Sequence, residues 1–92
     1  MIEENSHSDY SAIADEQLDI LEAGDDLDLY NAALDACDLV FQAPGIAKSR
    51  STAIQTAEGV RFRLPIVGHP PYKVFWSHTG DGPRIEAVFP HP

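Results

Sequence analysis

The fold is decided by residues 71–90, PYKVFWSHTGDGPRIEAVFP, in which two runs of alternating apolar and polar side chains flank a glycine-containing turn. Alternation of this kind is typical of β-strands that bury one face. The turn Thr79–Gly82 has the length and residue types of a hairpin loop, so the strands expected at about 72–78 and 84–90 are antiparallel neighbours. Three apolar residues of the second strand are expected to share one face: Ile85, Ala87 and Phe89.

A third strand is expected just before this hairpin, at about residues 60–66. In the stretch GVRFRLP, apolar residues alternate with Arg61 and Arg63, so one face of the strand is apolar and the other is cationic. Pro65 has no N–H group to donate to a sheet. This proline therefore either places the strand at the edge of the sheet or marks the end of the strand.

The acidic first half of the chain has apolar residues at three- and four-residue steps, the spacing that indicates amphipathic helices. The first helix is expected at about residues 9–23. Ser8 or Asp9 is its candidate N-cap, because short polar side chains accept hydrogen bonds from the first free N–H groups of a helix. Gly24 stands where the helix is expected to end.

The second helix is expected at about residues 26–43, with Asp25 or Asp26 as its N-cap and Pro44–Gly45 at its end. The connection between the two helices is only a few residues long, which predicts an antiparallel helical hairpin. Cys37 lies on the apolar stripe of the second helix. We therefore expect a buried, unreactive thiol.

These elements predict an α+β fold with an antiparallel helical hairpin packed on one face of a three- to four-stranded antiparallel sheet. Residues 9–92 are expected to form one domain, after a flexible N-terminus at residues 1–8. Ala53–Thr56 is the candidate for a short fourth strand, and the rest of residues 46–58 is expected to be loop. Trp76 is expected in the core. The other face of the sheet would then be open to solvent.

The charges are divided between the two halves of the chain. The protein has 92 residues and a formal net charge of −9, yet residues 1–40 contain 12 acidic residues and no Lys or Arg, whereas residues 41–92 contain 3 acidic residues and 6 basic ones. A polyanion could therefore approach only the sheet. The acidic helical surface is expected to serve solubility, with a docking surface for a basic partner or a mimic of nucleic acid as the alternatives.

Several classes of protein are disfavoured. A single cysteine allows neither an internal disulfide nor a cysteine-rich metal site. No apolar run approaches the ~18 residues of a transmembrane helix, and the first residues do not resemble a signal peptide, so we expect a cytoplasmic location. Three histidines lack the spacing of zinc ligands: His7, His69 and His78.

The second half of the chain shows an ordered series of short patterns. Gly59 opens an arginine-bearing strand, the apolar run Tyr72–Trp76 follows, and after a polar turn comes Ile-Glu-Ala-Val at Ile85–Val88. Two helices precede these strands. This order and these residues resemble the RelE/ParE superfamily of toxins from bacterial toxin–antitoxin systems. The resemblance implies the same α+β fold.

The resemblance also implies an activity. In the ribonuclease branch of the superfamily the toxin is a metal-independent mRNA endoribonuclease whose catalytic arginine lies on the strand before the last hairpin, a position matched here by Arg61 or Arg63. Some members carry a histidine near the end of the chain as general acid or base, which His91 matches. An antitoxin protein is the implied partner, with mRNA or the ribosome as target and with no cofactor.

The residue types fit that chemistry. Cleavage of RNA through its own 2′-hydroxyl needs a base, an acid and cations around the phosphate. Arg61 and Arg63 are suited to clamp the phosphate, His91 to act as acid or base, and Glu86 to act as the partner base. Three further residues are expected to bind nucleic acid: Lys73, Phe75 and Arg84.

Other interpretations fit the same residues. The two arginines of the third strand also match the solvated face of any half-buried strand, and Glu86 also matches a cross-strand partner of a basic residue. The same fold could be a non-catalytic binding module directed at gyrase or at a partner protein. An acidic protein-interaction domain is a further alternative, because a fold alone does not determine function.

Overall fold

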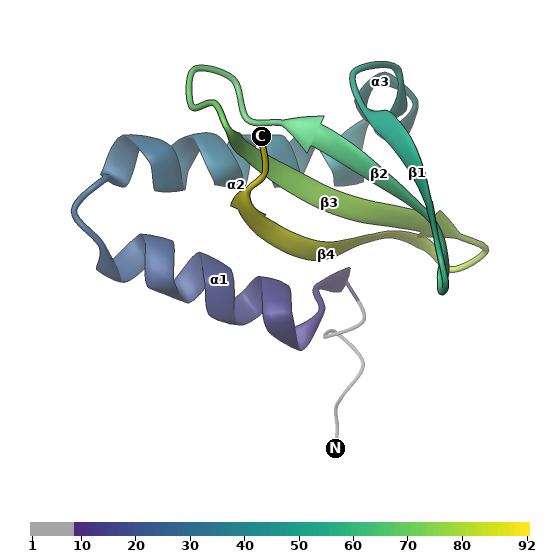
Figure 1. Cartoon of the computed structure of the whole chain (residues 1–92), viewed down its shortest axis with the longest axis horizontal. Helices are drawn as coiled ribbons and strands as arrows, with labels where there is room; N and C mark the ends of the chain where they lie inside the picture. The colour runs from purple at the N-terminus through teal and green to yellow at the C-terminus, as the bar shows by residue number, and fades with distance from the viewer. Residues whose placement is uncertain (1–8) are drawn as a thin grey trace.

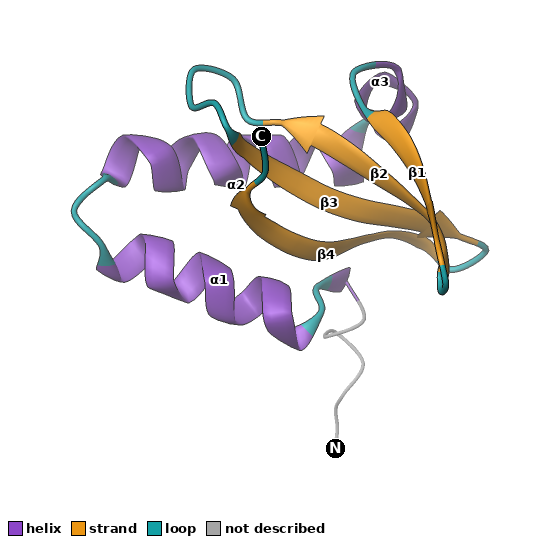
Figure 2. Cartoon of the chain, viewed as in Figure 1, coloured by secondary structure: helices purple, strands orange, loops and turns teal. Residues whose placement is uncertain are grey.

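The computed structural model describes residues 9–92 and contains three helices and four strands (Figures 1 and 2). The expectations for residues 1–8, including Ser8 as an N-cap, lie outside the described residues. The elements in chain order are α1 (Ala12–Ala23), α2 (Leu27–Gln42), α3 (Pro44–Ser49), β1 (Thr52–Thr56), β2 (Gly59–Pro65), β3 (Tyr72–Thr79) and β4 (Gly82–Pro90).

The four strands form one antiparallel sheet in the order β1-β2-β3-β4. Each strand pairs with the next along the chain, because short turns connect them. The short fourth strand is confirmed as β1, which pairs with β2 from Thr52 opposite Arg63 to Thr56 opposite Gly59. The α+β architecture with two helices packed on this sheet is the one expected. Pro65 marks the end of β2, which has β1 on one side and β3 on the other.

The helix ends show which capping residues are used. Ser11, rather than Asp9, caps α1, and its Oγ accepts a hydrogen bond from the Ala14 N–H at 3.0 Å. Asp26 caps α2 by accepting from the Leu29 N–H at 3.0 Å. The first helix ends at Gly24 as expected.

One expectation for the region after α2 was wrong. Residues 44–49 form the short helix α3 instead of loop. Pro44 occupies the first turn of α3, where the missing N–H of proline costs no helical hydrogen bond. The same proline that ends α2 therefore begins the next helix.

Helix α1 lies alongside β4 and satisfies the outer edge of this strand (Figure 1). The Ser11 N–H donates to the Ile85 carbonyl at 2.9 Å, and Ser11 Oγ donates to the Glu86 carbonyl. The Val88 N–H donates to Gln17 Oε1 at 2.6 Å. Unpaired N–H and C=O groups of an edge strand would otherwise be open to pairing with another chain. The first helix thus closes this edge of the sheet.

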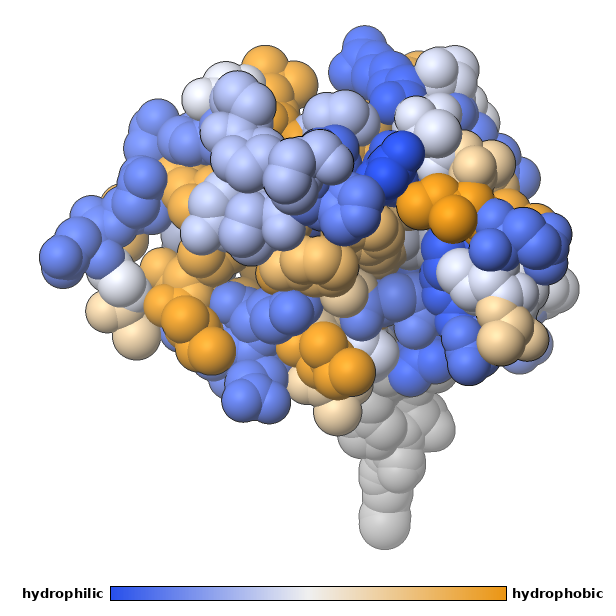
Figure 3. Space-filling model, in the orientation of Figure 1, coloured by the Kyte–Doolittle hydropathy of each residue, from blue (hydrophilic) through white to orange (hydrophobic). Residues whose placement is uncertain are grey.

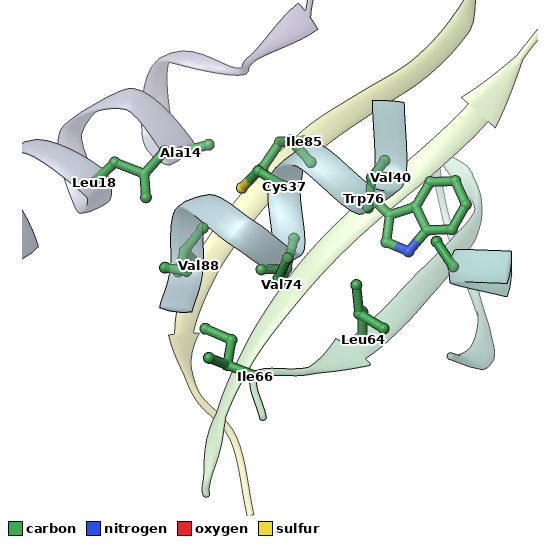
Figure 4. Close-up of a cluster of buried hydrophobic side chains, with 13 residues drawn as sticks. Ala14, Leu18, Cys37, Val40, Leu64, Ile66, Val74, Trp76, Ile85 and Val88 are labelled. Carbon is green, nitrogen blue, oxygen red and sulfur yellow. The ribbon is translucent and has the colours of Figure 1, made fainter. Parts of the chain in front are cut away.

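The core lies between the helices and one face of the sheet, and α1 contributes Ala14 and Leu18 to it (Figure 4). Trp76 is completely buried as expected, and its indole N–H donates to Ser51 Oγ at 3.1 Å. Cys37 is also completely buried. Burial raises the pKa of this thiol to about 12, although a hydrogen bond with Tyr10 opposes part of the shift. A protonated, enclosed thiol is unreactive.

A β-bulge in β4 overturns the expected face assignment of this strand. Phe75 pairs with Ala87 and Trp76 pairs with Ile85, so Glu86 is an extra residue between two pairs. Beyond the bulge the alternation is reversed, and Val88 is buried in the core with Ile85. Ala87 and Phe89 therefore lie on the open face and do not share a face with Ile85.

The hydrogen bond from the Val88 N–H to the Gln17 side chain predicts what happens when that side chain is removed. In Gln17→Ala the part-buried Val88 N–H loses its acceptor, so the free energy of unfolding should fall by about 1–2 kcal/mol in urea denaturation. Glu16→Ala is the matched control, because Glu16 is an exposed residue of the same helix and its loss should cost less than about 0.5 kcal/mol. Equal effects of the two variants would contradict the contact.

Cys37 predicts a pH dependence of stability. Its pKa is raised from 9.0 to about 12 in the folded protein, so the thiol ionises first in the unfolded chain. The buried, protonated thiol therefore contributes its full stabilisation below about pH 9, and this contribution is lost as the pH rises toward 12. Between these values the unfolding free energy should fall more steeply for the wild type than for Cys37→Ala, by about 1.4 kcal/mol per pH unit. Parallel pH profiles would contradict this prediction.

Candidate nucleic-acid interface

The face of the sheet turned away from α2 carries most of the residues expected to act on nucleic acid. On the side of the molecule in Figure 3, hydrophilic and hydrophobic side chains interleave over the strands. Strand register places the following residues on this open face: Arg61, Arg63, Lys73, Phe75, Arg84, Phe89 and His91. They form two groups.

The first group, which we call the aromatic–basic cluster, consists of Arg63, Lys73, Phe75, Phe89 and His91. Arg63 Nη1 lies 3.2 Å from His91 Nδ1, and Lys73 Nζ donates to the His91 carbonyl and, at 3.3 Å, to the Pro71 carbonyl. The rings of Phe75 and Phe89 are stacked, with centroids 4.6 Å apart and planes within 9°. The imidazole of His91 meets Phe75 edge-on at 5.5 Å. Three strands and the residues after β4 thus converge on one spot.

The contact between Arg63 and His91 defines the tautomer of the imidazole. A guanidinium group has only donors, so Nδ1 of His91 must be the acceptor and must carry no proton. The proton of the neutral ring is then on Nε2. In this arrangement His91 offers a hydrogen-bond donor to a ligand, and the nitrogen that could take up a proton is occupied by Arg63.

The second group, which we call the arginine groove, consists of Arg61, Ser77, Arg84 and Glu86. These residues line a polar groove of about 510 Å³ next to the β3–β4 turn. Glu86 Oε2 accepts from Ser77 Oγ at 2.8 Å, and Glu86 Oε1 lies 3.9 Å from Arg84 Nη1. The carboxylate of Glu86 is therefore held by its neighbours on the sheet.

The structure separates the two residues proposed as an acid–base pair. Glu86 contacts Ser77 and Arg84, whereas His91 contacts Arg63 and Lys73. Among residues 9–92, no hydrogen bond joins Glu86 to His91. Arg61 and Arg63 are separated in the same way, because Arg61 lines the arginine groove and Arg63 contacts His91.

Sequence reasoning missed Phe89 as a member of this face. Strict alternation from Ile85 assigns Phe89 to the buried side, and the bulge at Glu86 reverses that assignment. Ala87, Val88 and Phe89 are all apolar, so hydrophobicity alone does not locate the bulge. The three-residue spacing between the buried residues Ile85 and Val88 is the signal that could have indicated it.

Other features of the described chain add no further chemistry. Residues 9–92 contain no group of three or more His, Cys, Asp or Glu side chains that could hold a metal ion. His69 contacts Asp28, with Nε2 and Oδ2 3.4 Å apart, and thereby links the β2–β3 loop to α2. Within the same residues, no helix has the length and apolar character needed to cross a membrane.

Comparison of the chain with models of known protein families, with curated proteins and with solved structures gave no match. Function is therefore inferred from the geometry of the open face and from the resemblance carried by residues 59–90.

The tautomer of His91 is directly measurable. In long-range ¹H–¹⁵N spectra at about pH 8.5, where imidazoles are neutral, Nδ1 of His91 should show the shift of an unprotonated nitrogen and Nε2 that of a protonated one. Exposed His78 is the internal control and should show a mixture of tautomers. In Arg63→Ala, the ¹⁵N chemical shifts of the His91 ring should move toward those of the His78 ring. A protonated Nδ1 in the wild type would contradict the contact.

Proposed function

We propose that this protein binds single-stranded RNA through the open face of its sheet, as a RelE/ParE-like toxin component of a bacterial toxin–antitoxin system. The observation that carries the proposal is the aromatic–basic cluster, in which a stacked pair of half-buried phenylalanine rings adjoins Arg63 and Lys73. Aromatic rings that stack bases beside cations that hold phosphates are the usual means of binding a single strand.

The rings supply the contact with a base. Phe75 and Phe89 already stack on each other, and a nucleobase can extend such a stack because every base has a flat π-face. In a duplex the bases are stacked on one another and are not free to do this. The rings therefore favour a single strand over a double helix.

The basic side chains supply the contact with a phosphate. The guanidinium of Arg63 has donors to spare after its contact with His91, and the ammonium of Lys73 is held in place by two carbonyl oxygens. His91 adds the N–H of Nε2. Charged donors that are already positioned lose less entropy when they bind an anion.

The geometry supports binding better than cleavage. The Nδ1 atom of His91 is engaged by Arg63, and Glu86 belongs to the separate arginine groove. The two side chains expected to act as acid and base therefore have other partners, since His91 contacts Arg63 and Glu86 contacts Ser77 and Arg84. A protein of this kind would block its RNA in the cytoplasm by occupying it and would be neutralised by an antitoxin protein.

The acidic helices limit how RNA can approach. Residues 1–40 carry no Lys or Arg, so the helical side of the molecule repels a polyanion while the sheet attracts it. Affinity should consequently fall steeply with salt concentration.

Fluorescence anisotropy with a labelled single-stranded RNA of about 12 nucleotides tests the proposal. Phe89→Ala and Arg63→Gln should each weaken binding by about tenfold, because one removes a stacking ring and the other a phosphate contact. Val60→Ala and Arg50→Gln are matched controls, since they remove an exposed apolar side chain and an exposed positive charge outside the open face. The controls should bind within about twofold of the wild type.

Two results would overturn the proposal. One is the absence of saturable RNA binding at low salt, and the other is an equal loss of affinity in the Arg63 and Arg50 variants, which would indicate a general charge effect. Expression in a bacterium tests the toxin role separately: growth arrest that Phe89→Ala and Arg63→Gln relieve supports it, and arrest unchanged in both variants contradicts the assigned surface.

A further inference from the structure

An apolar groove lies on the helical side of the molecule, between α2 and the end of β2. Its volume is about 590 Å³. The apolar residues that line it are Ala32, Ala36 and Leu39 from α2 together with Leu64, Pro65 and Val67 from β2 and the following loop. Because α2 covers the face opposite the aromatic–basic cluster, this groove is separate from the proposed RNA surface.

The groove exists because β1 is shorter than β2. The pairing of these strands stops at Thr52 opposite Arg63, so Leu64 and Pro65 pair with β3 on one side and have no neighbouring strand on the β1 side. The Ile66 N–H donates to the Tyr72 carbonyl and therefore points toward β3. Because successive backbone nitrogens of a strand point to opposite sides, the nitrogen of Pro65 points away from β3, toward the free edge. Proline has no N–H to donate there. An added strand would find no donor at this position, so the groove is better suited to a helix.

The floor of the groove has the shape that a helix needs. Ala32, Ala36 and Leu39 are spaced at four and three residues and form one stripe of α2. Two of these three side chains are small, which allows the axis of a second helix to approach to about 8–10 Å. At the rim, Val67 is 85% exposed and extends the apolar lining of the groove toward solvent.

The charges of the groove indicate what the occupant carries. Asp35 lies in the wall of the groove, between Ala32 and Ala36 in the sequence. Asp28, which contacts His69, lies two turns earlier on α2 and outside the lining of the groove. Among residues 9–92, Asp35 has no ion-pair partner within 4.0 Å, and α1 and α2 contain no Lys or Arg. The only basic residue of the wall is Arg50, which follows α3.

From these observations we infer that the groove binds an amphipathic helix of a partner protein, with apolar residues in the groove and Lys or Arg side chains facing Asp35 and Asp28. A second copy of this chain fits poorly, because its helices are acidic and would repel the acidic stripe. The inference stands on the groove alone and does not depend on RNA binding.

An NMR titration of the ¹⁵N-labelled protein tests this inference. The probe is a helical peptide of about 18 residues with a leucine face and a lysine face, and its matched control has glutamate in place of every lysine. The lysine peptide should shift the amides of residues 32–39 and 64–67 with a Kd of about 10–100 μM. The glutamate peptide should bind at least about tenfold more weakly.

Variants make the test specific. Val67→Asp should weaken the lysine peptide about tenfold by placing a charge at the apolar rim, and Asp35→Lys should reverse the preference so that the glutamate peptide binds better. Ile20→Asp is the control, because Ile20 is equally apolar and 63% exposed but lies on α1. Circular dichroism confirms that each variant is folded.

Three outcomes would overturn the inference: no saturable shifts with the lysine peptide, shifts confined to α1, or an unchanged preference in folded Asp35→Lys. Val67→Asp should leave RNA affinity unchanged, so a failure at the groove is distinguishable from a failure of the proposed RNA surface.

Discussion

The structure depends on one extra residue in β4. Glu86 forms a bulge between the pairs Phe75–Ala87 and Trp76–Ile85. Hydrogen bonds fix this residue both at the outer edge of β4 and on the open face of the sheet. On the outer edge, Ser11 Oγ donates to the Glu86 carbonyl and also accepts from the Ala14 N–H as the cap of α1. On the open face, Ser77 donates to the Glu86 carboxylate. A bulge reverses the faces of all residues beyond it. The start of the first helix, the burial of Val88 and the exposure of Phe89 all follow from this one irregularity.

The second organising feature is the separation of charge between the layers. Helices α1 and α2 contain no basic residue, whereas the basic residues of the open face come from β2, β3 and β4. An anion would therefore be attracted to the open face of the sheet, and a cation to the helices α1 and α2. The two proposed surfaces follow this division, since RNA is assigned to the sheet and a basic helix to the groove beside α2. Binding at one surface leaves the other accessible.

Local signals in the sequence predicted most of the fold. Alternation in β2 and β3 and the caps at Asp26 and Gly24 act within a few residues, so sequence patterns report them directly. Some of the missed features depend on distant contacts. The cap bond of Ser11 to the Ala14 N–H is local, but its bond to the Glu86 carbonyl, 75 residues away on β4, cannot be read from a local pattern. Helix α3 was missed for a local reason, because Pro44 fits both the end of one helix and the start of another. The position of Phe89 required the bulge, which pairing between strands decides.

The bulge brings Phe89 onto Phe75 and so forms the surface that we propose for single-stranded RNA. Ultraviolet cross-linking of the protein to a labelled single strand, followed by mass spectrometry of the cross-linked peptides, tests it most directly, because cross-links form where bases contact side chains. Cross-links are expected at Phe75 in β3, at Phe89 near the end of β4, or at His91 just after β4. Cross-links located on α1 or α2, or none above the background of a protein lacking both rings, would contradict it.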